Sequence, residues 1–142
     1  MKQRLNYVTI AVQDFNKSLT FYKDGLGWKP FQIVEGTIAF FGVGGLIFSI
    51  CSRKELSDDV QVELTTKPYL GVTFSQNVPS KEAVDEVFAT IRQANGTIVK
   101  EPHATSWGGY NGYFSDPEGH LWEIAYNPQS TFDSQGDMTV PS

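Results

Sequence analysis

Residues 112–128 read GYFSDPEGHLWEIAYNP and describe two strands joined by a tight turn. The turn occupies residues 116–119, where proline presets one φ and Gly119 supplies a conformation that other residues resist. The segments on either side, about 109–115 and 120–127, are rich in aromatic and β-branched residues. The stretch therefore predicts the last two strands of an antiparallel sheet.

The residues before this hairpin complete a larger unit. A strand is expected at 69–76, a helix at 80–95 and a further strand at 97–102. The helix is indicated by four apolar residues that share one stripe and by the glycine that follows, Gly96. The stripe consists of Val84, Val87, Phe88 and Ile91. The order of these elements is βαβββ.

The same order occurs earlier in the chain. A strand is expected at 5–12, then a helix at 14–24 that Asp14 can cap, and then strands at about 28–34, 37–41 and 46–51. The two units are about 65 residues apart, a spacing typical of a duplication. Two internal matches support it: Val8-Thr9 with Val72-Thr73, and Phe48-Ser49-Ile50-Cys51 with Trp122-Glu123-Ile124-Ala125.

The remaining segments are polar. Residues 52–67 show little periodicity and are interpreted as a linker between units at about 4–51 and 68–128. Residues 129–142 form a polar tail that we expect to be loosely held. The chain is therefore predicted to be one domain, 1–128, with a C-terminal tail.

Composition excludes several classes of function. The chain has 142 residues, of which 40% are hydrophobic and 19% charged, as in globular proteins. Its net charge of −5 and the lack of a basic run argue against nucleic acid as a partner. No apolar stretch approaches 18 residues, so we expect no membrane span. We also expect no signal peptide, and the single cysteine, Cys51, favours the cytoplasm.

The alternation of strand residues predicts what each sheet face carries. A helix covers one face, and the uniformly apolar residues should meet it. Tyr7, Thr9, Thr73, Ser75 and Glu123 then fall on the other faces. Small polar groups with a tyrosine and a carboxylate suit a small-ligand site better than a dry core.

Two stretches carry a resemblance to a known family. The chain resembles the vicinal oxygen chelate (VOC) superfamily over about residues 4–128. The resemblance rests on the stretch at 112–128 and on residues 8–28, which read VTIAVQDFNKSLTFYKDGLGW. This group contains glyoxalase I, bleomycin resistance proteins, fosfomycin-modifying enzymes and extradiol dioxygenases. The resemblance implies an α+β fold in which two tandem βαβββ units form a cup of curved mixed sheets with helices outside. It also implies a small-molecule ligand and a homodimer.

The resemblance further implies four positions that hold a divalent metal in many members, usually with histidine, glutamate or glutamine. In this chain they are Tyr7, Ser49, Gly71 and Glu123, of which only Glu123 is such a ligand. The two histidines, His103 and His120, do not restore the set. His120 is three residues before Glu123, so the two side chains face opposite ways in a regular strand. We therefore expect no metal cofactor.

Glu123 is the main candidate for a functional residue. It could bind a cationic or hydrogen-bond-donating ligand, or act as a general base. It could also be a remnant of the family motif, paired with Tyr7 or an arginine. Tyr7 is interpreted mainly as filling the space of a metal, the alternative being a catalytic acid that works with Glu123 as base.

Further candidates come from a glycine-containing loop and from the strands. Trp107, Tyr110 and Tyr113 are interpreted as aromatic walls of a ligand pocket, the alternative being packing at a sheet edge. Ser49, Thr73 and Ser75 become interesting only if they share the cup with Glu123. His120 and Asp116 are assigned structural roles in the turn.

The preferred hypothesis is a glyoxalase or bleomycin resistance-like protein that binds a small molecule without a metal. Its acidic charge favours a cationic ligand and its aromatic residues favour an aromatic one. A metal-dependent lyase or dioxygenase with unusual ligands remains an alternative. So does a cofactor-free lyase or isomerase with Glu123 as base. The sequence leaves open whether a reaction is catalysed.

Overall fold

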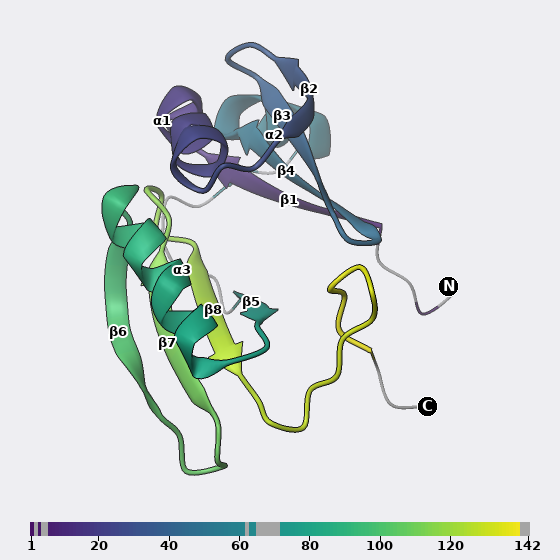
Figure 1. Ribbon diagram of the computed structural model, residues 1–142. Coiled ribbons are helices and arrows are strands. Elements are labelled where there is room, and N and C mark those ends of the chain that lie inside the picture. Colours follow the sequence, from purple (N-terminus) through teal and green to yellow (C-terminus); the bar gives the residue numbers. More distant parts are fainter. Residues whose placement is uncertain (2, 4–5, 62, 65–71, 140–142) are drawn as a thin grey trace. The chain divides into compact units, whose positions relative to one another are not determined.

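The computed structural model describes residues 1, 3, 6–61, 63–64 and 72–139. The chain divides into two compact units, Met1–Pro68 and Tyr69–Ser142, and each has its own sheet (Figure 1). The expected residues Leu5, Gly71 and the start of the fifth strand lie outside the described part. No helix within the described part is long and apolar enough to cross a membrane.

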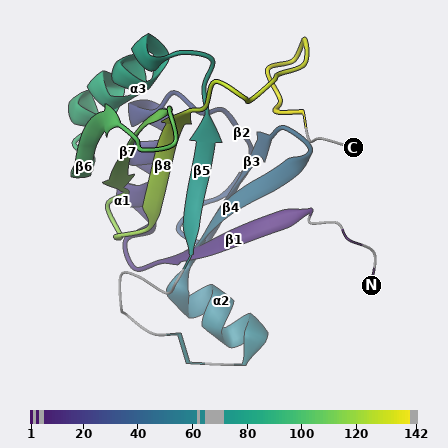
Figure 2. The same cartoon turned by 90° about the horizontal axis from the view of Figure 1, so that it is seen from below.

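The first unit contains a four-stranded mixed sheet in the order β1-β4-β3-β2. β1 runs parallel to β4, its neighbour in Figure 2, whereas the β2–β3 and β3–β4 pairs are antiparallel. The elements are β1 Tyr7–Val12, α1 Phe15–Thr20, the π-helix η1 Phe21–Gly25, β2 Pro30–Val34, β3 Ile38–Val43, β4 Leu46–Ser52 and α2 Arg53–Val60.

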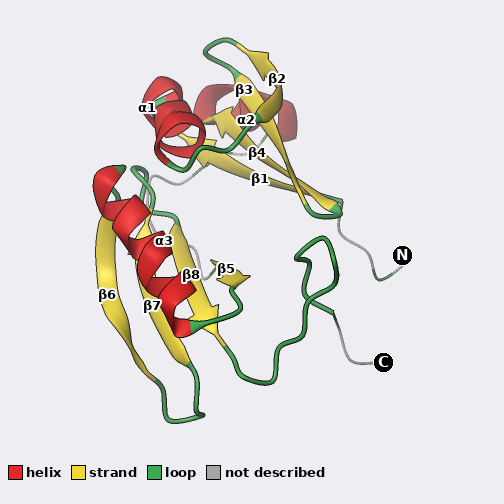
Figure 3. Ribbon diagram, viewed as in Figure 1, coloured by secondary structure: helices red, strands yellow, loops and turns green. Residues whose placement is uncertain are grey.

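The second unit repeats this topology with the order β5-β8-β7-β6. β5 runs parallel to β8, and α3 contacts β6, β7 and β8 along one face of the sheet (Figure 3). The elements are β5 Thr73–Asn77, α3 Lys81–Gln93, β6 Thr97–Ala104, β7 Tyr110–Ser115 and β8 Leu121–Tyr126. The predicted α+β class with tandem βαβββ units is confirmed.

In the first unit, the helix-facing residues of the strands are buried as the alternation predicts. Ile10 and Val12 of β1 and Ile50 of β4 are at most 5% exposed. They join an aromatic cluster in which Tyr22 contacts Trp28, Phe41 and Phe48 at centroid distances of 5.2–6.2 Å. Burial of these rings contributes to this unit's hydrophobic stabilisation.

In the second unit, the stripe of α3 forms the core. Val84, Phe88 and Ile91 are fully buried at helical spacing, and Ser80 caps the helix by accepting a hydrogen bond from Ala83 N at 3.1 Å. The ring of Phe88 meets Phe114 edge-on, and Phe114 stacks on Trp122. The helix-facing side of this sheet is therefore closed.

Two local features of the first unit differ from the sequence prediction. The segment at 52–67, expected to be a linker, contains α2, which Ser52 caps through Glu55 N at 3.3 Å. Because α2 buries no side chain, its sequence has no apolar stripe to reveal it. The helix expected at 14–24 changes to π geometry at Phe21, and the consecutive aromatic residues Phe21 and Tyr22 are both buried there.

The tail is also more ordered than expected. Phe132 and Met138 form an isolated antiparallel bridge. The amide of Asn77, at the end of β5, donates hydrogen bonds to Ser130 Oγ at 3.1 Å and Met138 Sδ at 3.5 Å. These contacts depend on an asparagine far away in the sequence, so the tail's own composition does not predict them.

Candidate functional site

A polar row crosses the face of the second sheet that α3 leaves uncovered. The register places Ser75 of β5 and Tyr113 of β7 directly opposite Glu123 of β8. Directly paired residues share a face of the sheet, and Trp122 and Ile124 point the other way, toward the core. Three neighbouring strands thus bring three polar side chains into one line.

Three side chains donate hydrogen bonds to the carboxylate of Glu123. Ser75 Oγ donates to Oε1 at 3.1 Å. Asn111 Nδ2 and the hydroxyl of Tyr113 both donate to Oε2, at 2.9 Å and 2.6 Å. The carboxylate is therefore held in one orientation by neutral donors.

The phenol of Tyr113 keeps its proton at neutral pH. Its hydrogen bond to Glu123 raises the pKa of Tyr113, and burial and the charge of the carboxylate act in the same direction. Within the described part of the chain, no lysine, arginine or histidine forms an ion pair with Glu123. Lys100 of β6 is paired with Tyr113 and so lies on the same face, two strands from Glu123, but the two form no ion pair.

Asn111 is a site residue that sequence reasoning missed. It is 7% exposed, and its Oδ1 is buried with no hydrogen-bond partner among the described residues. The alternation of side chains along a strand could have identified it, because Asn111 and Tyr113 are two residues apart in one strand and therefore point to the same face. Ser75, by contrast, was expected to matter only if it lies beside Glu123, and its hydroxyl does contact the Glu123 carboxylate.

The corresponding row of the first sheet lacks charge. Thr9 lies opposite Ser49, and their hydroxyls hydrogen-bond at 2.7 Å. Phe40 lies opposite Ser49 on the other side. The two internal matches of the sequence do not agree with one register, because Thr9 lies opposite Ser49 whereas Thr73 lies opposite Leu121 and Ser75 opposite Glu123. If Ser49 corresponds to Glu123, then Thr9 corresponds to Ser75 and not to Thr73.

The other predicted residue of the first unit is Tyr7. It is the first residue of β1, and 54% of its surface is exposed. Its expected hydrogen bond to Glu123 would join the two units and stays a prediction. Within the second unit, the phenol that meets Glu123 is that of Tyr113.

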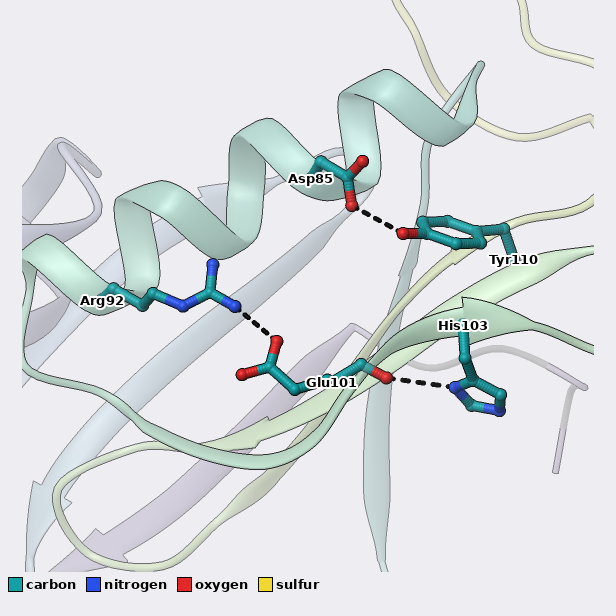
Figure 4. Close-up of polar contacts among 5 residues, drawn as sticks. All are labelled: Asp85, Arg92, Glu101, His103 and Tyr110. Carbon is teal, nitrogen blue, oxygen red and sulfur yellow. Dashed lines mark hydrogen bonds and ion pairs between the residues drawn. The ribbon is translucent and has the colours of Figure 1, made fainter.

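Tyr110 lies on the opposite face from Glu123, which corrects the expectation that it lines the same pocket. Its hydroxyl donates to Asp85 Oδ1 of α3 at 2.8 Å (Figure 4), and this bond raises the pKa of Tyr110. Arg92 of α3 pairs nearby with Glu101 of β6. Tyr110 is three residues before Tyr113, and an odd separation along a strand places two side chains on opposite faces.

Trp107 lies in the loop between β6 and β7 and is 52% exposed. Its ring covers the backbone of Gly109: a Cβ atom on that residue would lie 1.9 Å from Trp107 Cζ3. The loop thus needs glycine at position 109, because a side chain there would collide with the Trp107 ring. Whether the exposed side of the ring contacts a ligand stays a prediction.

The turn before β8 has the structural role expected for it. Asp116 Oδ1 accepts hydrogen bonds from the backbone of Glu118 and His120, both at 2.9 Å. Asp116 Oδ2 lies 2.8 Å from His120 Nδ1. The other histidine, His103, is paired with Asn111 across β6 and β7, and its Nδ1 lies 3.1 Å from the carbonyl of Glu101 (Figure 4).

The divalent metal that the resemblance implies does not fit the residues present. The four positions supply a phenol, a hydroxyl, a glycine without a side chain, and one carboxylate. In the described part of the chain, no three His, Cys, Asp or Glu residues are grouped closely enough to hold a metal ion. Such sites usually need three or more of these ligands.

Comparison with known proteins gives a family match over most of the chain. The model of the glyoxalase/bleomycin resistance protein/dioxygenase superfamily matches residues 4–124. A probable lactoylglutathione lyase of Synechocystis sp. is 32% identical, over 84% of this chain and 92% of its own. The glutathione transferase FosA of Serratia marcescens is 30% identical, over 87% and 81%.

Further matches include a metallothiol transferase FosB of Staphylococcus saprophyticus, 27% identical over 87% of this chain and 77% of its own. Among solved structures, a glyoxalase-related enzyme of Fulvimarina pelagi has a TM-score of 0.90 and 29% identity, covering 99% of this chain and all of its own. The fosfomycin resistance protein FosX of Listeria monocytogenes shares the fold, with a TM-score of 0.69, 22% identity and coverage of 89% and 95%.

Proposed function

The chain belongs to the glyoxalase/bleomycin resistance protein/dioxygenase superfamily, and we propose that it binds a small molecule on the polar face of its second sheet, with Glu123 as the principal contact. The observation that carries the proposal is the set of three neutral donors around one carboxylate. Such a carboxylate is oriented before a ligand arrives, which reduces the entropic cost of binding.

We further propose that binding needs no metal. The support is the donor set: of the four family positions, only Glu123 carries a usual metal ligand. The relative from Staphylococcus saprophyticus, named a metallothiol transferase, shows why this needs a direct measurement.

The deciding experiment is a metal analysis of protein purified without chelator and without a metal-affinity tag. We expect Mn, Fe, Co, Ni and Zn well below one equivalent per chain. A near-stoichiometric metal that disappears in Glu123→Ala would overturn metal independence and favour a metal-dependent lyase, transferase or dioxygenase.

Ligand binding is tested by a thermal-shift screen with cationic, aromatic and dicarbonyl compounds. We expect at least one compound to raise the melting temperature of the wild type more than that of Glu123→Gln, which keeps the shape of the side chain and removes its charge. Compounds that stabilise both proteins equally would remove the carboxylate from the binding site.

A second candidate is a cofactor-free lyase or isomerase. The observation that favours it is the hydrogen bond of 2.6 Å between Tyr113 and Glu123. In that scheme Glu123 takes a proton from a carbon of the substrate, and the Tyr113 hydroxyl supports the carboxylate in both protonation states. Turnover that is lost in Glu123→Gln while binding is retained would favour this candidate.

Two expectations about the whole protein belong with the proposal. A homodimer is expected because two-fold assemblies are the commonest oligomers, and light scattering tests it. A reducing, cytoplasmic location is expected because the single cysteine, Cys51, is buried and unbridged. Cell fractionation tests this second expectation.

A further inference from the structure

The two oxygens of Glu123 have different surroundings. Oε2 accepts from Asn111 and Tyr113 through hydrogen bonds that are partly buried, whereas Oε1 accepts only from Ser75, through an exposed one. An ionised carboxylate offers about two acceptor sites on each oxygen. Both sites of Oε2 are thus occupied, and one site of Oε1 is left over on the accessible side.

The side-chain amide of Asn111 is oriented by the carboxylate of Glu123. The Nδ2 group donates to Glu123, while Oδ1 is buried with no partner among the described residues. Turning the amide over would place a carbonyl oxygen against a carboxylate oxygen, so this orientation is the favourable one. A buried acceptor without a partner is rare in folded proteins and calls for an explanation.

The three donors leave the charge of Glu123 uncompensated. Serine, asparagine and tyrosine are all neutral, and the raised pKa of Tyr113 keeps its phenol in the donating form. Ion pairs elsewhere in the described chain join other residues, such as Arg92 with Glu101. Lys100 of β6, which lies opposite Tyr113 on the same face, forms no ion pair with Glu123 either. A positively charged donor on a ligand would therefore complement the remaining acceptor site of Oε1.

We propose that Oε1 of Glu123 receives an N–H-bearing cationic group of the ligand, an amidinium, guanidinium or primary ammonium, and that Asn111 and Tyr113 act as positioning residues that hold Oε2. This inference deepens the proposed function and rests on it. A quaternary ammonium would satisfy the charge but not the hydrogen bond, and a neutral amide would satisfy only the hydrogen bond.

Three probes of similar size separate these contributions: benzamidine, benzamide and benzyltrimethylammonium. Their dissociation constants are measured by calorimetry or by NMR titration. We expect benzamidine to bind about tenfold more tightly than either of the others, as hydrogen bonds to charged groups are about twice as strong as neutral ones. Equal binding of benzamide would overturn the cationic ligand class.

The positioning role is tested with a matched pair of tyrosines on β7. Each hydroxyl donates to a carboxylate, Tyr113 to Glu123 and Tyr110 to Asp85 on the opposite face. We expect Tyr113→Phe to lower the preference for benzamidine over benzamide about fivefold, and Tyr110→Phe to leave it within twofold. A merely structural role of Tyr113 would lower stability without changing this preference.

Asn111→Leu provides a second variant that removes the other donor to Oε2. We expect the same loss of preference, and Glu123→Gln should abolish the preference altogether. Circular dichroism and a melting curve for each variant confirm that it is folded. If Asn111→Leu fails to fold, Tyr113→Phe alone decides the positioning role.

The outcomes distinguish the two proposals. Glu123-dependent binding that does not discriminate among the probes, or a preference unchanged in Tyr113→Phe, would overturn this inference and leave the proposed function standing. No detectable binding of benzamidine at millimolar concentrations would also overturn it. The thermal-shift comparison of wild type with Glu123→Gln tests the proposed function separately, because it uses a broader set of compounds.

Discussion

The hydroxyl of Tyr113 donates a hydrogen bond of 2.6 Å to the carboxylate of Glu123, across two antiparallel strands of the second sheet. The relationship depends on the register that places these residues directly opposite each other. It connects an acidic residue in the last strand with an aromatic one in the strand before it. Four predictions about the fold and this contact can be measured.

The first prediction concerns alkaline stability. The hydrogen bond to Glu123 raises the pKa of Tyr113 in the folded protein. Above the ordinary tyrosine pKa of about 10, the unfolded chain loses this proton while the folded protein keeps it. The stabilisation is therefore complete below that pH and is lost as pH rises through the raised folded pKa.

Urea unfolding at a series of pH values measures this effect. We expect the free energy of unfolding to fall less steeply above pH 10 in Tyr113→Phe than in the wild type. Absorbance titration near 295 nm, a wavelength at which ionised phenols absorb, should show one fewer late-titrating tyrosine in the variant. An identical alkaline slope in both proteins would contradict the assignment.

The second prediction concerns the close approach of α3 to β7. A Cβ atom on Gly112 would lie 2.6 Å from Phe88 Cζ and 2.9 Å from the carbonyl oxygen of Lys100. We expect Gly112→Ala to lower the free energy of unfolding by about 1–3 kcal/mol, the usual cost of overpacking. Chemical denaturation measures it.

Gly42→Ala in β3 is the matched control, because nothing lies within 4 Å of a Cβ atom built there. Its effect should stay within about 0.5 kcal/mol, as for other substitutions without steric conflict. A similar loss in both variants would mean that backbone freedom, rather than contact with Phe88, explains the glycine.

The third prediction compares two aspartates whose Oδ1 atoms accept the same pattern of backbone hydrogen bonds, although Asp116 also contacts His120 through Oδ2. Asp116 Oδ1 accepts from two backbone N–H groups, and so does Asp133 Oδ1 in the tail, from Gln135 and Asp137. Asp116 is 2% exposed, whereas Asp133 is exposed. Asp116→Ala should cost about 2–4 kcal/mol because it leaves two partly buried backbone donors and the ring of His120 without their partner.

Asp133→Ala should cost less than about 1 kcal/mol, because water replaces the carboxylate there. Thermal or urea unfolding of the two variants side by side gives the comparison. Equal losses would contradict the idea that burial determines the value of this turn.

The fourth prediction concerns helix capping. Ser80 caps α3, which buries three core residues, whereas Ser52 caps α2, which buries none. Ser80→Ala should lower the free energy of unfolding by about 1 kcal/mol. Ser52→Ala should affect only local amide exchange in α2, because that helix can fray without opening the core. A global loss in Ser52→Ala would show that α2 supports the fold.

Most of the fold can be predicted from local patterns. Apolar residues at helical spacing predicted α3, and strand alternation predicted the buried residues Ile10 and Val12 of β1. In β8 it predicted the burial of Ile124 but not that of Ala125 on the other face. The helix α2 escaped prediction because a helix that buries no side chain shows no stripe. The tail contact with Asn77 escaped because it joins residues more than fifty positions apart.

Less of the candidate site than of the fold can be predicted from the sequence. The sequence by itself determined the family, the one carboxylate that survives among four family positions, and the face of β8 on which that carboxylate lies. Only the tertiary structure decided that Ser75, Asn111 and Tyr113 meet it, and that Tyr110 does not. The physical reason is that strand register depends on packing across strands. Residue type and alternation specify a face, but not the partner that lies opposite on it.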